Sequence, residues 1–193
     1  ELDNTVIIYS SDNGYFMGEH TYLDKRLAYE NSMRVPMVIR YPELIHKNTT
    51  VKQKCLNIDL APTILNLAGL DIPNYMQGES MVDLLKGNDV DDWRDAILFE
   101  YFKDTYWPYA GPNQIAVRTD RYKLVDCFLK NDIDELYDLQ TDPGEMTNLI
   151  NDSSYDAVEQ DLREQATLLK KQFKYNPNRD WWLKKVMNSK RIK

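Results

Sequence analysis

The sequence is poor in residues that cross-link a chain or carry it through a membrane. Its 193 residues include only two histidines and two cysteines, Cys55 and Cys127. Two separated cysteines are too few for a disulfide framework and lack the clustered spacing of a zinc site, so we expect both to be buried free thiols. The apolar runs are far shorter than the roughly 20 residues that a membrane-spanning helix requires, so we expect no membrane span.

An excess of positive charge is also missing. Lys and Arg total 24, Asp and Glu total 31, and the formal net charge is −7. Because binding to phosphates needs a basic face, this balance argues against nucleic acid as the main partner. Residues 156–193 are the exception, with ten Lys or Arg against five Asp or Glu. Such a tail could meet an anionic polymer, although a solvated helix face is the commoner case.

The first half of the chain has the pattern of an α/β domain. Residues 5–9 and 37–41 are short apolar, β-branched runs, which predict strands of a parallel sheet buried on both faces. Helices are expected after Asp59 and after Ser80, where a capping residue precedes an apolar stretch that ends in glycine. We therefore assign residues 1–93 to part of a catalytic α/β domain.

The second half, residues 94–193, predicts a small α+β subdomain. Strands separated by turn residues are expected at residues 96–102, 114–119, 121–126 and 135–139. Short connections between consecutive strands favour an antiparallel sheet, and Thr119-Asp120 suits a hairpin turn. From Asp152 to Lys174, apolar residues recur in steps of three and four, which predicts an amphipathic helix packed on the sheet.

One short motif follows the first predicted strand directly. Asp12, Asn13 and Gly14 stand where open α/β sheets place their ligands, beyond the carboxyl end of a strand. The first two offer adjacent oxygen ligands, which suit a hard cation such as Ca²⁺ better than Zn²⁺. The three residues alone are also ordinary turn sequence.

The wider sequence around this motif resembles a known family. Residues 11–20 read Ser-Asp-Asn-Gly-Tyr-Phe-Met-Gly-Glu-His, and Lys25 and Arg34-Val35-Pro36 follow. Further matches come in order at residues 57–65, 67–69, 118–124, 135–139, 142–145 and 148–149. The ordered set resembles the sulfatases, in the branch that includes N-acetylglucosamine-6-sulfatases and other glycosaminoglycan sulfatases. The resemblance implies an alkaline-phosphatase-like fold.

The resemblance also implies roles for four residues. Asp12 and Asn13 match the family's second pair of calcium ligands. Lys25 matches a lysine that contacts the sulfate group, where its charge would stabilise the sulfuryl oxygens. His20 could donate a proton or a hydrogen bond to the substrate, or it could be a structural loop residue. The implied reaction is hydrolysis of a sulfate ester on a sulfated sugar.

The rest of such an active site is missing from the chain. Sulfatases need a Cys or Ser in a Cys/Ser-x-Pro/Ala-x-Arg motif, converted to a formylglycine nucleophile, and neither Cys55 nor Cys127 begins one. Calcium takes about six to eight oxygen ligands, and Asp12 and Asn13 cannot hold it alone. We therefore expect a C-terminal portion of a longer sulfatase, inactive by itself, whose N-terminal part supplies the nucleophile and the other ligands.

Two alternatives stay open. A zinc phosphatase or phosphodiesterase of the same fold is one, although such enzymes tend to have Asp-His where this chain has Asp12-Asn13. The other is a non-catalytic fragment that binds an anionic glycan through the basic tail with Trp181 and Trp182. The opening residues Glu1-Leu2-Asp3-Asn4 show no signal peptide, but in a fragment this says nothing of the compartment. Family habit implies export or a lysosome.

Overall fold

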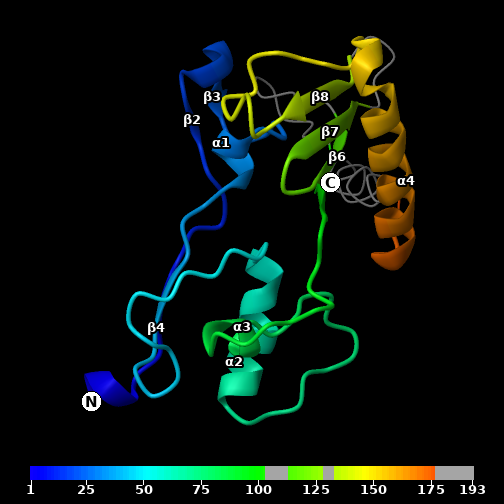
Figure 1. Cartoon of the computed structure of the whole chain (residues 1–193). Helices are drawn as coiled ribbons and strands as arrows, with labels where there is room; N and C mark the ends of the chain where they lie inside the picture. The colour runs from blue at the N-terminus through cyan, green and yellow to red at the C-terminus, as the bar shows by residue number, and fades with distance from the viewer. Residues whose placement is uncertain (103–112, 128–132, 177–193) are drawn as a thin grey trace, which may run out of the picture. The chain divides into compact units, whose positions relative to one another are not determined.

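The chain forms two compact units in a computed structural model (Figure 1). The structure describes residues 1–102, 113–127 and 133–176. One unit comprises Glu1–Gly14 and Arg34–Asp95, and the other comprises Tyr15–Met33 and Ala96–Lys193. The predicted domain boundary at residue 93 stays a prediction, while the contacts within the chain group residues 15–33 with its second half.

Two strands of the first unit pair with each other. After a short 3₁₀ turn, η1 (Leu2–Asn4), strand β1 (Ile7–Tyr9) lies antiparallel to β4 (Val38–Arg40). In this chain their apolar side chains are largely exposed, Tyr9 by 67% and Val38 by 61%, and burial beneath further strands from outside the chain stays a prediction. Their residue types favoured strands, but a two-stranded ribbon cannot cover its own faces, and local sequence does not fix the direction of a partner strand.

The helices of the first unit surround a small apolar core. They are η3 (Asn57–Asp59), α2 (Leu60–Leu67) and α3 (Val82–Leu85). Gly69 ends α2 with a φ of 70°, the left-handed conformation expected of a glycine just past a helix. Buried side chains come from α3 and from the residues on either side of it: Met81, Leu84, Leu85 and Trp93.

The second unit is built on a four-stranded antiparallel sheet. Its strands, in spatial order, are β5 (Ile97–Tyr101), β6 (Gln114–Arg118), β7 (Tyr122–Cys127) and β8 (Glu135–Asp138). All four predicted strands are confirmed. The turn between β6 and β7 is closed by the N–H of Thr119, which donates to the carbonyl of Tyr122 at 2.9 Å.

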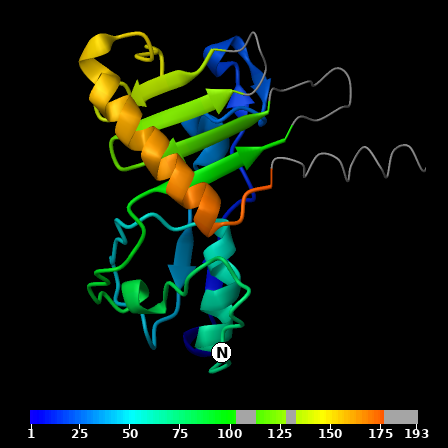
Figure 2. The ribbon, with the colours of Figure 1, turned by 90° about the vertical axis from the view of Figure 1, so that its right-hand side faces the viewer.

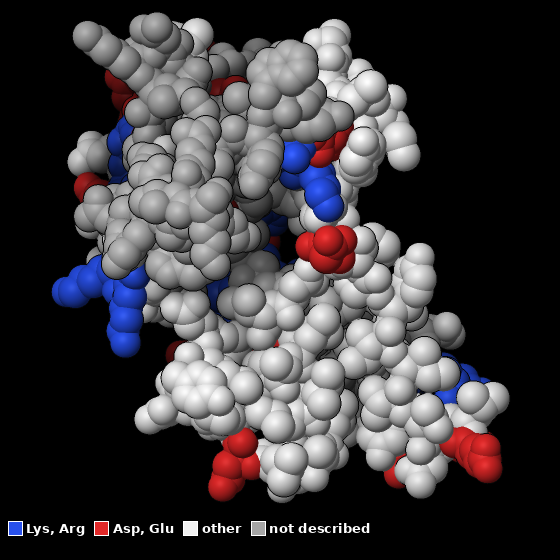
Figure 3. Space-filling model, turned by 180° about the vertical axis from the view of Figure 1, so that it is seen from behind, with Lys and Arg blue, Asp and Glu red and all other residues white. Residues whose placement is uncertain are grey.

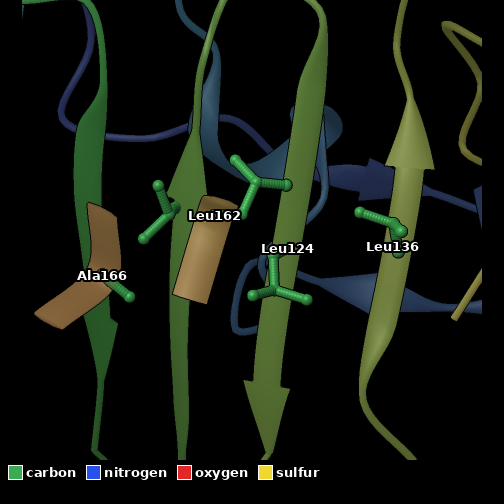
Figure 4. Close-up of a cluster of buried hydrophobic side chains, with 5 residues drawn as sticks. Leu124, Leu136, Leu162 and Ala166 are labelled. Atoms are coloured by element: carbon green, nitrogen blue, oxygen red, sulfur yellow. The ribbon is translucent and has the colours of Figure 1, made fainter. Parts of the chain in front are cut away.

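One face of this sheet is covered by helix α4 (Asp156–Gln172), which follows η4 (Ser153–Tyr155). The helix runs diagonally across the strands (Figure 2). Leu162 and Ala166 point from it toward Leu124 and Leu136 of the sheet (Figure 4), and all four are buried. The amphipathic helix predicted from the spacing of apolar residues is therefore confirmed.

The opposite face is covered by residues 15–33. They form β2 (Phe16–Met17), η2 (Glu19–Thr21), β3 (Leu23–Asp24) and α1 (Glu30–Met33), with β2 and β3 paired antiparallel. Ala28 packs against Ala116 and Val125 in a second buried cluster. Because side chains alternate along a strand, Val125 faces this cluster while its neighbour Leu124 faces α4.

Three expectations about composition can be compared with the described residues. No helix among them is long and apolar enough to cross a membrane. Cys55 and Cys127 are free, as predicted, but half-buried rather than buried. On the face shown in Figure 3, the acidic and basic side chains of the described residues are interspersed and form no single patch. Residues 177–193 of the predicted basic tail, with Trp181 and Trp182, lie outside the described residues.

Candidate active-site segments

The Asp12-Asn13 pair lies in the turn that follows β1. Oδ1 of Asp12 accepts the backbone N–H of Asn13 at 3.0 Å and the Ser11 hydroxyl at 3.4 Å. Nδ2 of Asn13 donates to the Gly14 carbonyl at 2.7 Å, so the side-chain oxygen is the atom of Asn13 that a cation would use. Asp12 is exposed and Asn13 half-buried, which leaves both accessible to a ligand.

Asn57 fixes the backbone of this turn. Its Nδ2 donates to the carbonyl oxygens of Ser11 at 3.0 Å and Asp12 at 2.9 Å. Asn57 is not among the site residues predicted from the sequence. Its only signal was its place as the first residue of the matched stretch 57–65.

A buried ion pair holds the region around Asn57. Asp59 is fully buried, and Arg94 donates to both its carboxylate oxygens, at 2.5 and 2.8 Å. The same carboxylate accepts the backbone N–H groups of Leu56 at 2.7 Å and Glu79 at 2.9 Å. Asp59 occupies the predicted N-cap position of α2, but its side chain makes no cap hydrogen bond to that helix and is used by Arg94 and these two N–H groups instead.

Close backbone packing makes this arrangement possible. Gly78 lies against the peptide of Ile58, where a Cβ would come within 2.1 Å of the carbonyl oxygen. Only glycine permits this approach, because any other residue would displace the backbone. The next residue, Glu79, can then deliver its N–H to the carboxylate of Asp59.

The donors of Asp12 and Asn13 fit a hard cation in kind but not in number. Both offer oxygen, as Ca²⁺ prefers, and two residues fall short of the roughly six to eight ligands that it takes. In the part of the chain that the structure describes, no group of three or more His, Cys, Asp or Glu could hold a metal ion. The pair can therefore supply only part of a calcium site.

His20 lies in an aromatic cluster of the second unit. Its ring stacks on Tyr29 with centroids 4.1 Å apart, and Phe16, fully buried, meets both rings edge-on. The backbone of His20 is left-handed, with a φ of 54°. Since the ring stacks on one side and remains half-buried, both predicted roles, substrate contact and structural loop residue, stay open.

Lys25 follows β3, and its side chain is exposed. Its backbone is well held: the Ser32 hydroxyl donates to its carbonyl at 2.6 Å, and its own N–H donates to Oδ1 of Asp24 at 2.8 Å. A lysine with a fixed backbone and an exposed side chain suits the binding of an anion.

A buried ionic cluster attaches this segment to the sheet. Lys123 of β7 is fully buried and forms ion pairs with Glu145 and, at 3.3 Å, with Glu30 of α1. Arg118 also pairs with Glu30, at 3.2 Å, and Glu145 accepts the backbone N–H of Glu30 at 2.7 Å. The cluster therefore joins α1 to β6, β7 and the loop that carries Glu145.

The two carboxylates of this cluster shift in opposite directions. Burial alone would raise the pKa of Glu30, but the charges of Lys123 and Arg118 outweigh it and the pKa is lowered. Burial also raises the pKa of Glu145, and Lys123 only partly offsets this, so the net shift is upward. Glu30, with two cations beside it, is the better stabilised anion.

Tyr29 joins the aromatic cluster to the sheet. Its hydroxyl lies 3.2 Å from Oε1 of Glu135 and 3.5 Å from the hydroxyl of Tyr137. Burial, with the charge of Glu135 adding to it, raises the pKa of Tyr29 to about 12. Burial likewise raises the pKa of Glu135. Tyr29 therefore links His20, on which its ring stacks, to strand β8.

The four predicted site residues thus fall into two pairs. Asp12 and Asn13 belong to the first unit, and His20 and Lys25 to the second. Each pair has a defined setting in its own unit, and their roles stay predictions.

A family model described as N-sulphoglucosamine sulphohydrolase, C-terminal, matches residues 18–172. The chain belongs to this family. It is 38% identical over 182 residues to an N-acetylglucosamine-6-O-sulfatase of Bacteroides thetaiotaomicron, covering 91% of the chain and 32% of that protein. It is 45% identical over 103 residues to human N-acetylglucosamine-6-sulfatase, covering 52% of the chain and 18% of that protein.

Solved structures of this family's relatives share the fold. One, determined with its substrate D-glucosamine-2-N,6-O-disulfate, has a TM-score of 0.85 and 36% identity, covering 92% of the chain and 36% of that protein. A phosphonate monoester hydrolase of Agrobacterium radiobacter has a TM-score of 0.78 and 31% identity, covering 89% and 36%. These likenesses confirm the predicted sulfatase resemblance and fold class. The chain spans about a third of the length of the N-acetylglucosamine-6-O-sulfatase that it matches.

Proposed function

We propose that this chain is the C-terminal part of a sulfatase that hydrolyses sulfate esters of a sulfated amino sugar, as in glycosaminoglycans. The observation that carries the proposal is the likeness over more than nine-tenths of the chain to an N-acetylglucosamine-6-O-sulfatase and to a structure holding a disulfated glucosamine. The membership of the sulphohydrolase family supports the same reaction class.

Within that enzyme, residues of this chain bind the metal ion and the substrate and orient the sulfate group. Asp12 and Asn13 provide two oxygen ligands to Ca²⁺, which, when bound, polarises a sulfate oxygen as a Lewis acid. The ammonium of Lys25 binds the sulfate group and stabilises the negative charge on its oxygens. His20, whose ring stacks on Tyr29, is the candidate for a hydrogen bond to the substrate.

The N-terminal part of the same polypeptide supplies what this chain lacks. It contributes the formylglycine nucleophile and the remaining calcium ligands, and it covers the apolar side chains that β1 and β4 leave exposed. Ile7, Tyr9 and Val38 are each more than two-fifths exposed, which is a poor arrangement in water and a good one beneath further strands.

Hydrolysis of a phosphonate or phosphate ester is the second candidate. The fold and 31% identity shared with a phosphonate monoester hydrolase favour it. The oxygen donors of Asp12 and Asn13 count against a zinc phosphatase, because zinc prefers His and Cys. The metal content of the native polypeptide separates the two: calcium supports the sulfatase, and zinc supports the phosphatase.

The test is an assay of the native polypeptide that contains this chain, after conversion of its nucleophile to formylglycine. We expect release of sulfate from N-acetylglucosamine-6-sulfate, and no turnover by residues 1–193 alone. Faster hydrolysis of a phenyl phosphonate than of the sulfate ester would replace the proposal by the second candidate. An inactive polypeptide that is retained on heparin would favour the non-catalytic glycan-binding alternative.

A further inference from the structure

One side chain contacts the backbone of the candidate calcium ligands without being a candidate ligand itself. Asn57 donates from Nδ2 to the carbonyls of Ser11 and Asp12, at 3.0 and 2.9 Å. An amide group has two N–H donors, so one Asn can satisfy both carbonyls at once. The two bonds hold consecutive peptide groups of the turn, just before the side chains of Asp12 and Asn13.

Asn57 is itself held on both sides. The residue before it, Leu56, donates its N–H to the buried carboxylate of Asp59, and Asp59 is fixed by Arg94. The short turn η3 that begins at Asn57 therefore has little freedom. A donor on such a rigid support can hold a neighbouring loop in one conformation at small further loss of entropy.

These bonds also decide which oxygens of the turn face a cation. Backbone carbonyls are good calcium ligands, and the amide of Asn57 engages those of Ser11 and Asp12. The nitrogen of the Asn13 side chain is held by Gly14. The side-chain oxygens of Asp12 and Asn13 are then the groups of this turn that are presented for coordination.

We propose that Asn57 is a positioning residue for the calcium site: it orients the Asp12-Asn13 pair by bonding the backbone of Ser11 and Asp12. This inference rests on the proposed function, since it takes the pair to be calcium ligands. Outer partners of metal ligands act in this way in other proteins, and their loss typically weakens metal binding about 10- to 100-fold.

The test measures calcium affinity rather than activity. The native polypeptide is stripped of metal with a chelator, and binding of Ca²⁺ is followed by titration calorimetry. We expect Asn57→Ala to raise the Kd for Ca²⁺ by about 10-fold or more. The two bonds are exposed to solvent, so water can replace the lost donor and the metal-free melting temperature should change by less than about 4 °C.

The matched control is Asn66→Ala. Asn66 accepts a hydrogen bond from the Ser80 hydroxyl at 2.8 Å, in the same unit and equally exposed, and no hydrogen bond links it to residues 11–13. This variant should leave the Kd for Ca²⁺ unchanged. If Asn57→Ala does not fold, Asn57→Ser takes its place, because serine suits a helix start but is too short to bridge both carbonyls.

The outcomes separate the inference from the function beneath it. Weaker calcium binding in the Asn57 variant alone supports the positioning role. Unchanged binding in that variant, or equal weakening in both variants, overturns it while the calcium site stands. A wild-type polypeptide that binds no Ca²⁺ removes the metal assignment, and the positioning role falls with it.

Discussion

Arg94 donates from both terminal nitrogens to the two carboxylate oxygens of Asp59, a side chain with no exposed surface. Asp59 in turn holds the backbone at Leu56 and Glu79. Because the carboxylate of Asp59 has no access to water, its negative charge is stabilised mainly by the guanidinium group of Arg94.

Removal of this partner should destabilise the first unit strongly. Arg94→Met leaves a buried, unpaired carboxylate, and we expect a loss of about 3–5 kcal/mol in the free energy of unfolding. Urea unfolding followed by circular dichroism measures it. The control is Arg40→Met, which breaks the exposed ion pair with Asp3 and should cost about 0–1 kcal/mol. Equal small effects of the two variants would contradict the prediction.

The buried cluster around Lys123 should show a pH-dependent defect when its cation is removed. Lys123→Met leaves Glu30 and Glu145 without the shared cation, so their pKa values rise above those of the wild type. A carboxyl group whose pKa is raised in the folded state destabilises that state when it is charged, and it is charged at the higher pH. The variant should therefore lose more stability at pH 8 than at pH 5.

The measurement is urea unfolding of Lys123→Met at both pH values, each compared with the wild type. Lys86→Met, which removes an exposed ion pair with Asp83, is the control and should change stability little at either pH. A loss for Lys123→Met that is the same at pH 5 and pH 8 would show that the carboxylates do not depend on the lysine.

Local sequence predicted the sheet and helix α4 of the second unit well because these elements are set by neighbours in the chain. Strands β6 and β7 and the turn at Thr119-Asp120 depend on residues a few positions apart, and so does the apolar stripe of α4. Lys123 shows where this ends. Its neighbours Leu124 and Val125 are both apolar, and the lysine is buried by contacts with residues distant in the sequence, Glu30 and Glu145.

The same reason explains the errors and omissions elsewhere. The partner of Asp59 is 35 residues away at Arg94, and the carbonyls that Asn57 binds are about 45 positions earlier. Local propensity contains no information about either contact. Asp12 and Asn13 were candidates from their place after the first strand, and the ordered set of matched motifs gave them and Lys25 their expected roles. The structure gives their setting rather than their role.

Tyr29 should titrate well above an ordinary tyrosine. Burial, together with the nearby charge of Glu135, raises its pKa to about 12, whereas the pKa of a tyrosine in an unfolded chain is about 10. Its raised pKa means that the contribution of Tyr29 to stability is complete below about pH 10 and is lost as the pH rises toward about 12.

Ultraviolet absorbance of the tyrosinate, followed against pH, checks this prediction. Tyr29→Phe should remove one tyrosine from the last part of the titration and make stability fall less steeply above about pH 10. Tyr75→Phe, at a position that is 77% exposed, should leave that last part in place. An unchanged high-pH step in Tyr29→Phe would assign it to another residue.

Lys25 gives the sharpest test of the sulfate-binding role. If its ammonium stabilises charge on the sulfuryl oxygens, Lys25→Met should lower kcat/KM of the native polypeptide for a sulfate ester by roughly 10²–10³-fold. Its exposed side chain and a backbone held by Ser32 and Asp24 mean that stability should hardly change. Steady-state kinetics and a melting curve measure the two effects separately.

Lys47→Met is the matched control for this test, because Lys47 is also an exposed lysine and lies outside the segment that carries Lys25. It should leave kcat/KM unchanged. Lys25→Arg keeps the charge but alters its geometry, so we expect intermediate activity. If all three variants were as active as the wild type, Lys25 would be a surface lysine, and the positive charge at the sulfate group would have to come from the N-terminal part of the polypeptide.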